Sequence, residues 1–277
     1  MMSGRSFSSA FDFRLAILGF LVALFSAGIG IGGGTLLVSI LMAAFGFEFK
    51  KAASTSLATI IPISFVGAVN HVALLPAAPS LRLYLLFIPA CVLGTLLGGN
   101  IVREHRTGWL KLAFALFLLV VSLRMLKIFD VPLLLYSGIH TLLLTHESLL
   151  IIPVGILIGM IAVLLGIGCG LLIVPFYVIV IKLDMHQAIT LSLTTMFFLS
   201  VSATLIHNKL NTFDKTPMKS LFGPALAGAV AGAIISSHLP AFILKQLFGG
   251  FLFLISCNFI IQELKSYRSK AKTPQSL

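Results

Sequence analysis

The chain has 277 residues, of which 58% are hydrophobic and only 10% charged, and its mean hydropathy is +1.11. A soluble domain carries about 25% charged residues, so this composition excludes one, and three cysteines in apolar runs cannot form a disulfide framework. The net charge of +11 comes from 19 lysines and arginines that lie almost entirely between the apolar segments or at their ends. That placement is typical of charge-directed membrane topology and argues against nucleic acid as a partner.

Eight apolar segments follow one another along the chain, separated by charged or turn-rich stretches. They lie near 14–45, 52–70, 81–101, 109–127, 149–181, 187–206, 218–236 and 241–262. A bilayer core about 30 Å thick takes roughly 20 apolar residues per helical span. The sequence therefore predicts an all-α polytopic membrane protein with about eight helical segments in the lipid bilayer.

Two of these segments, 14–45 and 149–181, are too long for one straight span. At 1.5 Å per residue, the first would measure about 48 Å as a single helix. Each has glycines near its middle, at Gly28, Gly30, Gly32, Gly33 and Gly34 in the first and at Gly166, Gly168 and Gly170 in the second. Such clusters favour a broken or re-entrant helix. The first segment also has features of a signal peptide, but its glycine-rich continuation recurs deep in the chain, so we interpret it as mature structure.

An internal repeat relates the two halves. At an offset of 136, residues 30–71 align without a gap to 166–207, and 12 of the 42 positions are identical. The run GIGGGTLLVS falls on GIGCGLLIVP, and the matches include glycine, serine, threonine and histidine positions. We interpret the chain as a tandem duplication with five parts: a cytoplasmic N-terminal tail (1–13), a first transmembrane repeat (14–127), a link (128–148), a second repeat (149–264) and a basic cytoplasmic tail (265–277).

The glycine elements are the first candidate site. Repeated halves in membrane proteins place sites near the bilayer midplane at interrupted helices, and a helix that restarts there offers free N–H groups and a positive dipole end to an anion. The candidate glycines are Gly30, Gly32, Gly33, Gly34, Gly166, Gly168 and Gly170. The alternative is that they only permit close helix packing. For Gly94, Gly98, Gly228 and Gly232, small-residue packing is the preferred interpretation.

Hydroxyl and imidazole side chains form the second candidate set. Hydroxyls spaced by three and four residues share one helical face, where they can replace part of an anion's hydration shell, or they can bond to their own helix carbonyls. We favour the binding role for the repeated pairs. His71 and His207 end equivalent segments and can contact substrate, carry protons or anchor the interface. The candidates are Thr55, Ser56, Thr59, Ser192, Thr195, His71 and His207.

All eight acidic residues lie at segment ends or in links. Without a carboxylate in mid-span, a cation pathway or a carboxylate proton relay is disfavoured, and an anionic substrate is favoured. Counting lysines and arginines places both termini in the cytoplasm: 12 of 19 lie inside if each segment crosses once, and 14 of 19 if 14–45 and 149–181 each enter and return. The second arrangement inverts the repeats.

With GIGGGTLLV, AASTSLAT and their second copies, the chain resembles the TauE/SafE family of sulfite and organosulfonate exporters over residues 14–262. The resemblance implies a transporter of small anions in a bacterial-type cytoplasmic membrane, without a cofactor or metal. The matching positions are Gly30, Gly32, Gly33, Gly34, Val38, Thr55, Ser56, Gly166, Gly168, Gly170, Val174, Pro175 and Ser192. The departures are Ser39 for proline, Cys169, Ser54 and Thr190 for glycine, and Leu191 for threonine.

The predicted function is a secondary transporter for a small anion, with sulfite or an organosulfonate as the leading candidate. The alternatives are a non-transporting accessory or assembly protein and, less favoured, an intramembrane enzyme. No HExxH or GxSxG motif occurs and no aspartates face each other in the spans, so the usual chemistries of such enzymes lack their residues. The exact substrate, the direction of transport, the coupling ion and the existence of a homo-oligomer are left open.

Overall fold

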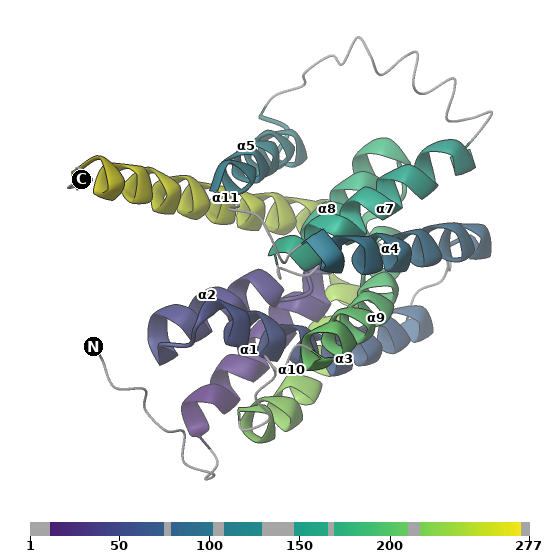
Figure 1. Cartoon of the computed structure of the whole chain (residues 1–277). Coiled ribbons are helices and arrows are strands. Elements are labelled where there is room, and N and C mark those ends of the chain that lie inside the picture. Colours follow the sequence, from purple (N-terminus) through teal and green to yellow (C-terminus); the bar gives the residue numbers. More distant parts are fainter. Residues whose placement is uncertain are drawn as a thin grey trace.

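The computed structural model describes residues 12–74, 79–101, 108–128, 147–165, 169–209 and 217–272, and in this part of the chain the regular structure is helical (Figure 1). The helices are α1 (Phe13–Ile29), α2 (Gly34–Phe45), α3 (Phe49–Leu74), α4 (Leu81–Ile101), α5 (Gly108–Met125), α7 (Glu147–Leu165), α8 (Gly170–Pro175), a π-helix η1 (Phe176–Val180), α9 (Met185–Lys209), α10 (Met218–His238) and α11 (Ala241–Lys272). Most of the predicted link and both chain ends lie outside the described residues.

The eight predicted segments are confirmed, and each falls on one helix or on one interrupted pair. By length and composition, five helices among the described residues can cross a bilayer: Lys51–Leu74, Leu81–Gly98, Met185–Ile206, Met218–His238 and Ala241–Ile261. Large apolar side chains point outward along them, such as Leu85 and Leu254, which are 64% and 68% exposed. Exposed apolar surface of this extent marks a membrane or partner contact, so the chain is a multi-pass membrane protein.

The first long segment is broken at its glycines, as predicted. Helix α1 ends at Ile29, and Gly30, Gly32 and Gly33 then adopt positive φ angles of 74°, 84° and 61° before α2 begins at Gly34. Only glycine adopts this left-handed backbone conformation at little cost in conformational free energy. Leu15 near the start of α1 and Leu41 near the end of α2 share one buried cluster, so α2 runs back beside α1 as a helical hairpin (Figure 1).

The second long segment is also interrupted. Helix α7 ends at Leu165, and α8 begins at Gly170 and continues through Pro175 into the π-helix η1. Gly166 and Gly168 lie outside the described residues, so the predictions made for them remain untested. A π-helical turn is rare and is often found at functional sites.

Helices of the first half pack on helices of the second half, and glycines lie at the contacts. Helix α1 packs most extensively on α10, and α4 packs on α7. A Cβ on Gly228 would overlap the Phe20 carbonyl, and one on Gly94 would overlap the Ile156 carbonyl. Gly232 lies in the same way against Leu24, and Gly98 against Met160. The packing role expected for these four glycines is therefore confirmed, and Phe20 and Ile156 are themselves 136 positions apart.

The contacts also give the helix directions. Along α1 and α10 the contacting residue numbers rise together, so these helices are parallel, as are α4 and α7. Helix α3 meets α9 through Phe65 and Phe197, whose ring centroids are 5.3 Å apart, and through Gly67 and Leu193. Since the numbers rise along α3 as they fall along α9, this pair is antiparallel.

Helices α5 and α11 form a second antiparallel pair. Gly249 lies against Met125 at the end of α5, and the Lys127 ammonium lies 5.9 Å from the Phe242 ring centroid near the start of α11. Helices α3 and α9 occupy corresponding places in the two aligned halves, and so do α5 and α11. Corresponding helices therefore pack against each other and run in opposite directions.

Candidate functional site

The two glycine elements meet in the interior. A Cβ on Gly170, at the start of α8, would lie 2.5 Å from the Gly30 carbonyl oxygen and closer still to the Ile31 carbonyl oxygen. Gly30 packs on Ile189 of α9, and Gly32 packs on the Met196 sulfur. The first break is therefore enclosed by α8 and α9 of the other half. Backbones can approach each other this closely only where the residues are glycines.

Two serines at equivalent positions donate hydrogen bonds to backbone carbonyls on either side of the first break. Ser192 Oγ donates to the Gly30 carbonyl at 2.9 Å, and Ser56 Oγ donates to the Gly34 carbonyl at 3.3 Å. Both serines are fully buried. Their hydroxyl protons thus hold the break in place, and Ser192 does so from the opposite half of the chain.

The predicted threonine pair behaves differently. Thr59 Oγ1 donates to the Thr55 carbonyl and Thr195 Oγ1 donates to the Leu191 carbonyl, both at 2.8 Å. These are bonds to the preceding turn of the same helix, one of the two arrangements that the sequence left open. The two threonines therefore make the same kind of bond in α3 and α9.

Three other hydroxyls close to α2 have no hydrogen-bond partner. They are the hydroxyls of Ser26, Thr35 and Thr55, whose side chains are 1%, 3% and 0% exposed. Thr55 belongs to the predicted set, whereas the sequence interpretation missed Ser26 and Thr35. Thr35 directly follows the glycine run, which was the available signal for it.

The two predicted histidines are not equally described. His71 is fully buried on α3, where its Nε2 lies 2.9 Å from the Ala27 carbonyl oxygen at the end of α1, and its Nδ1 has no partner. Because Nε2 faces an acceptor, it carries the proton, and Nδ1 is left as an acceptor. The side chain of His207 lies outside what the structure describes.

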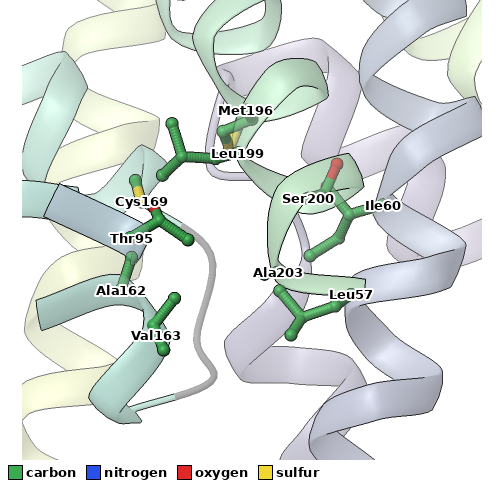
Figure 2. Close-up of a pocket in the computed structure, with 10 residues that line it drawn as sticks. All are labelled: Leu57, Ile60, Thr95, Ala162, Val163, Cys169, Met196, Leu199, Ser200 and Ala203. Carbon is green, nitrogen blue, oxygen red and sulfur yellow. The ribbon is translucent and has the colours of Figure 1, made fainter. Parts of the chain in front are cut away.

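A small pocket of about 10 Å³ lies beside the second break (Figure 2). That is roughly the space of one water molecule. Its lining is mainly apolar and comes from Leu57, Ile60, Thr95, Ala162, Val163, Cys169, Met196, Leu199, Ser200 and Ala203. Met196 separates the pocket from Gly32, since the same side chain contacts both.

The mainly apolar interior of the described structure contains polar side chains but no charged ones. Its buried polar side chains are serines, threonines and His71, and no acidic residue, lysine or arginine is buried in the described part of the chain. The described residues also contain no group of three or more His, Cys, Asp or Glu side chains placed to hold a metal ion. An interior of this composition can offer hydrogen bonds to a solute but no ion pair.

Comparison with known proteins agrees with this architecture. A family model described as "Sulfite exporter TauE/SafE" matches residues 5–127 and 151–277. A curated relative, "Probable membrane transporter protein YdhB" of Bacillus subtilis (strain 168), is 30% identical over 128 residues, which cover 46% of this chain. The match spans only 52% of that relative's length. No solved structure matches the chain significantly.

Proposed function

Since the chain belongs to the sulfite exporter TauE/SafE family, we propose that it is a secondary transporter that moves a small anion across the cytoplasmic membrane. Sulfite and organosulfonates are the leading substrates, and the substrate site lies between the two helix breaks. The observation that carries this proposal is the contact of Gly170 with the Gly30–Ile31 backbone, reinforced by the Ser192–Gly30 hydrogen bond. Matched interrupted helices that meet in the interior are typical of transporter substrate sites.

The two repeats are inverted in this proposal. Units related by a two-fold axis in the membrane plane run in opposite directions, whereas units related by an axis along the membrane normal run the same way. The antiparallel packing of α3 on α9 and of α5 on α11 supports the inverted arrangement. The charge count also favours it. Each half then consists of one hairpin and three crossings, with both chain termini in the cytoplasm.

Two equivalent contact groups flank the meeting point of the breaks. On one side Leu57, Val163 and Ala203 form a buried cluster. On the other side Gly67 packs on Leu193 and Ala27, and these positions correspond to the first three at an offset of 136. We expect the two groups to separate alternately as the halves rock against each other, so that the central site opens to one face at a time.

The uncharged interior favours an anion over a cation. A cation pathway through the bilayer uses carboxylates or rings of carbonyl groups, and no carboxylate is buried in the described part of the chain. The start of α2 instead offers free N–H groups, which favour negative charge.

Uptake by purified full-length protein in proteoliposomes tests this function. We expect saturable, time-dependent uptake of labelled sulfite or of a short alkyl sulfonate, well above uptake by protein-free liposomes. A protein that folds and reconstitutes, yet moves no anion of such a panel under imposed proton, sodium and voltage gradients, would instead be the accessory or assembly protein.

The inverted topology makes a separate prediction about two exposed lysines. Lys51 at the start of α3 and Lys182 before α9 are exposed. A membrane-impermeant maleimide should label the Lys182→Cys variant from outside intact cells, and it should label the Lys51→Cys variant only in inside-out vesicles. Labelling of both variants from the same side would rule out inverted repeats. The parent chain serves as the control for its own cysteines.

A further inference from the structure

Three buried hydroxyls around the first turn of α2 carry no hydrogen bond. Ser26 lies on the last turns of α1, Thr35 on the first turn of α2 and Thr55 on α3. A buried hydroxyl without a partner destabilises the folded chain, and native proteins contain few such groups. Three that gather at one place mark a position where a ligand would supply the missing partner.

These hydroxyls lie beside the free end of a helix. Ser26 Oγ is 3.4 Å from the position that a Cβ on Gly33 would occupy, and Gly33 is the N-cap residue of α2. The bond from Ser56 to Gly34 brings the turn of α3 that carries Thr55 beside the same turn of α2. Helix α2 has no side-chain cap and no acidic residue in its first turn, so its first N–H groups are without an intrahelical or capping partner.

The second half lacks hydroxyls at all three corresponding positions. At the offset of 136, Ser26 corresponds to Ala162, Thr35 to Leu171 and Thr55 to Leu191. The glycines and the structural serine of the same element are retained in both halves, at Gly34 and Gly170 and at Ser56 and Ser192. The frame of the break is therefore common to both halves, whereas the unpaired donors belong to the first half alone.

We propose that the oxyanion of the substrate binds at the N-terminus of α2, to its free N–H groups and to the hydroxyls of Ser26, Thr35 and Thr55. This inference rests on the proposed transport of an anion. It adds that the hydrogen-bond donors of the site come from the first half of the chain alone. From the second half, the apolar side chain of Met196 packs on Gly32 directly before that turn. The site recognises a small oxyanion by hydrogen bonds to its oxygen atoms and requires no basic side chain.

Direct binding to full-length protein in lipid nanodiscs tests the proposal, with labelled sulfite as the probe and ethanesulfonate as a competitor. Thr35→Val and Thr55→Val remove one donor each at nearly constant volume. A hydrogen bond to a charged group contributes enough to binding that each variant should bind sulfite about tenfold more weakly, or worse. Ser26→Ala should weaken binding in the same direction.

Stability of the ligand-free protein separates binding from folding. Because the three hydroxyls have no partner in the folded chain, their removal should leave the thermal midpoint unchanged or raise it. Tyr177→Phe is the matched control, since the Tyr177 hydroxyl is also buried and unpaired but lies in η1 of the second half. That variant should bind sulfite like the parent.

Two results would overturn the proposal in different ways. If the parent protein binds and transports sulfite while Thr35→Val and Thr55→Val retain parental affinity, the site is wrong and the transport function stands. If the parent protein neither binds nor transports any anion of the panel, the transport function fails and the site fails with it.

Discussion

Substitution of Gly170 by alanine is expected to abolish anion uptake. The new methyl group would lie 2.5 Å from the Gly30 carbonyl oxygen and nearer still to that of Ile31, and both obstacles are backbone atoms that cannot rotate away. Overpacking costs roughly 1–3 kcal/mol, and more where the backbone must move. We expect the two breaks to separate, with uptake of sulfite or alkyl sulfonate in proteoliposomes at least about tenfold lower than for the parent.

The control for this variant is Gly223→Ala. Gly223 is exposed on α10, and a Cβ there meets no heavy atom within 4 Å. Its substitution should leave uptake at the parental rate, because alanine is at least as good a helix former as glycine. Parental uptake by the Gly170→Ala variant would mean that contact between the two breaks is unnecessary for transport.

Replacement of Gly228 by valine is expected to give the largest loss of stability. Its side chain would enter the Phe20 carbonyl and force α10 away from α1, which is the most extensive helix contact in the described structure. Close backbone approach of this kind is a main source of helix association in membranes, where burial of apolar surface supplies little. A lower thermal midpoint in detergent and a lower yield of folded protein should follow.

Two comparisons test the cause of that loss. Gly94→Val should lower the midpoint in a similar way, because Gly94 lies against Ile156 as Gly228 lies against Phe20. Gly223→Val places the same β-branched residue on an open face of α10, and its effect should be limited to the change in helix propensity. Equal losses for Gly223→Val and Gly228→Val would show that propensity, rather than helix contact, causes the effect.

The break in the first long segment was accessible from sequence because it depends on local properties. Gly30, Gly32 and Gly33 permit positive φ, and a segment of 32 residues from 14 to 45 exceeds the bilayer thickness. Helix directions depend on contacts between residues far apart in the chain, such as Phe65 with Phe197. Charge counts alone favoured the inverted arrangement only slightly.

Side-chain roles were harder to predict than helix positions. Periodicity placed Ser56 and Thr59 on a polar face of one helix, but it could not indicate which carbonyls would accept their protons. The end of α1 exposes the Gly30 carbonyl, and Ser192 reaches it from 162 positions away. Ser26 and Thr35 were not predicted, because the internal repeat directed the choice of candidate residues and the second half carries no hydroxyl at the two corresponding positions.

A structure of the protein in lipid nanodiscs with bound selenite tests the central claim most directly. Selenite has the shape and charge of sulfite, and its heavier central atom can be located by its scattering. We predict density between the two breaks, at the first turn of α2 and within hydrogen-bond reach of the Thr35 hydroxyl. Density confined to the basic residues at the helix ends, with the space beside Thr35 filled by protein, would contradict a central anion site.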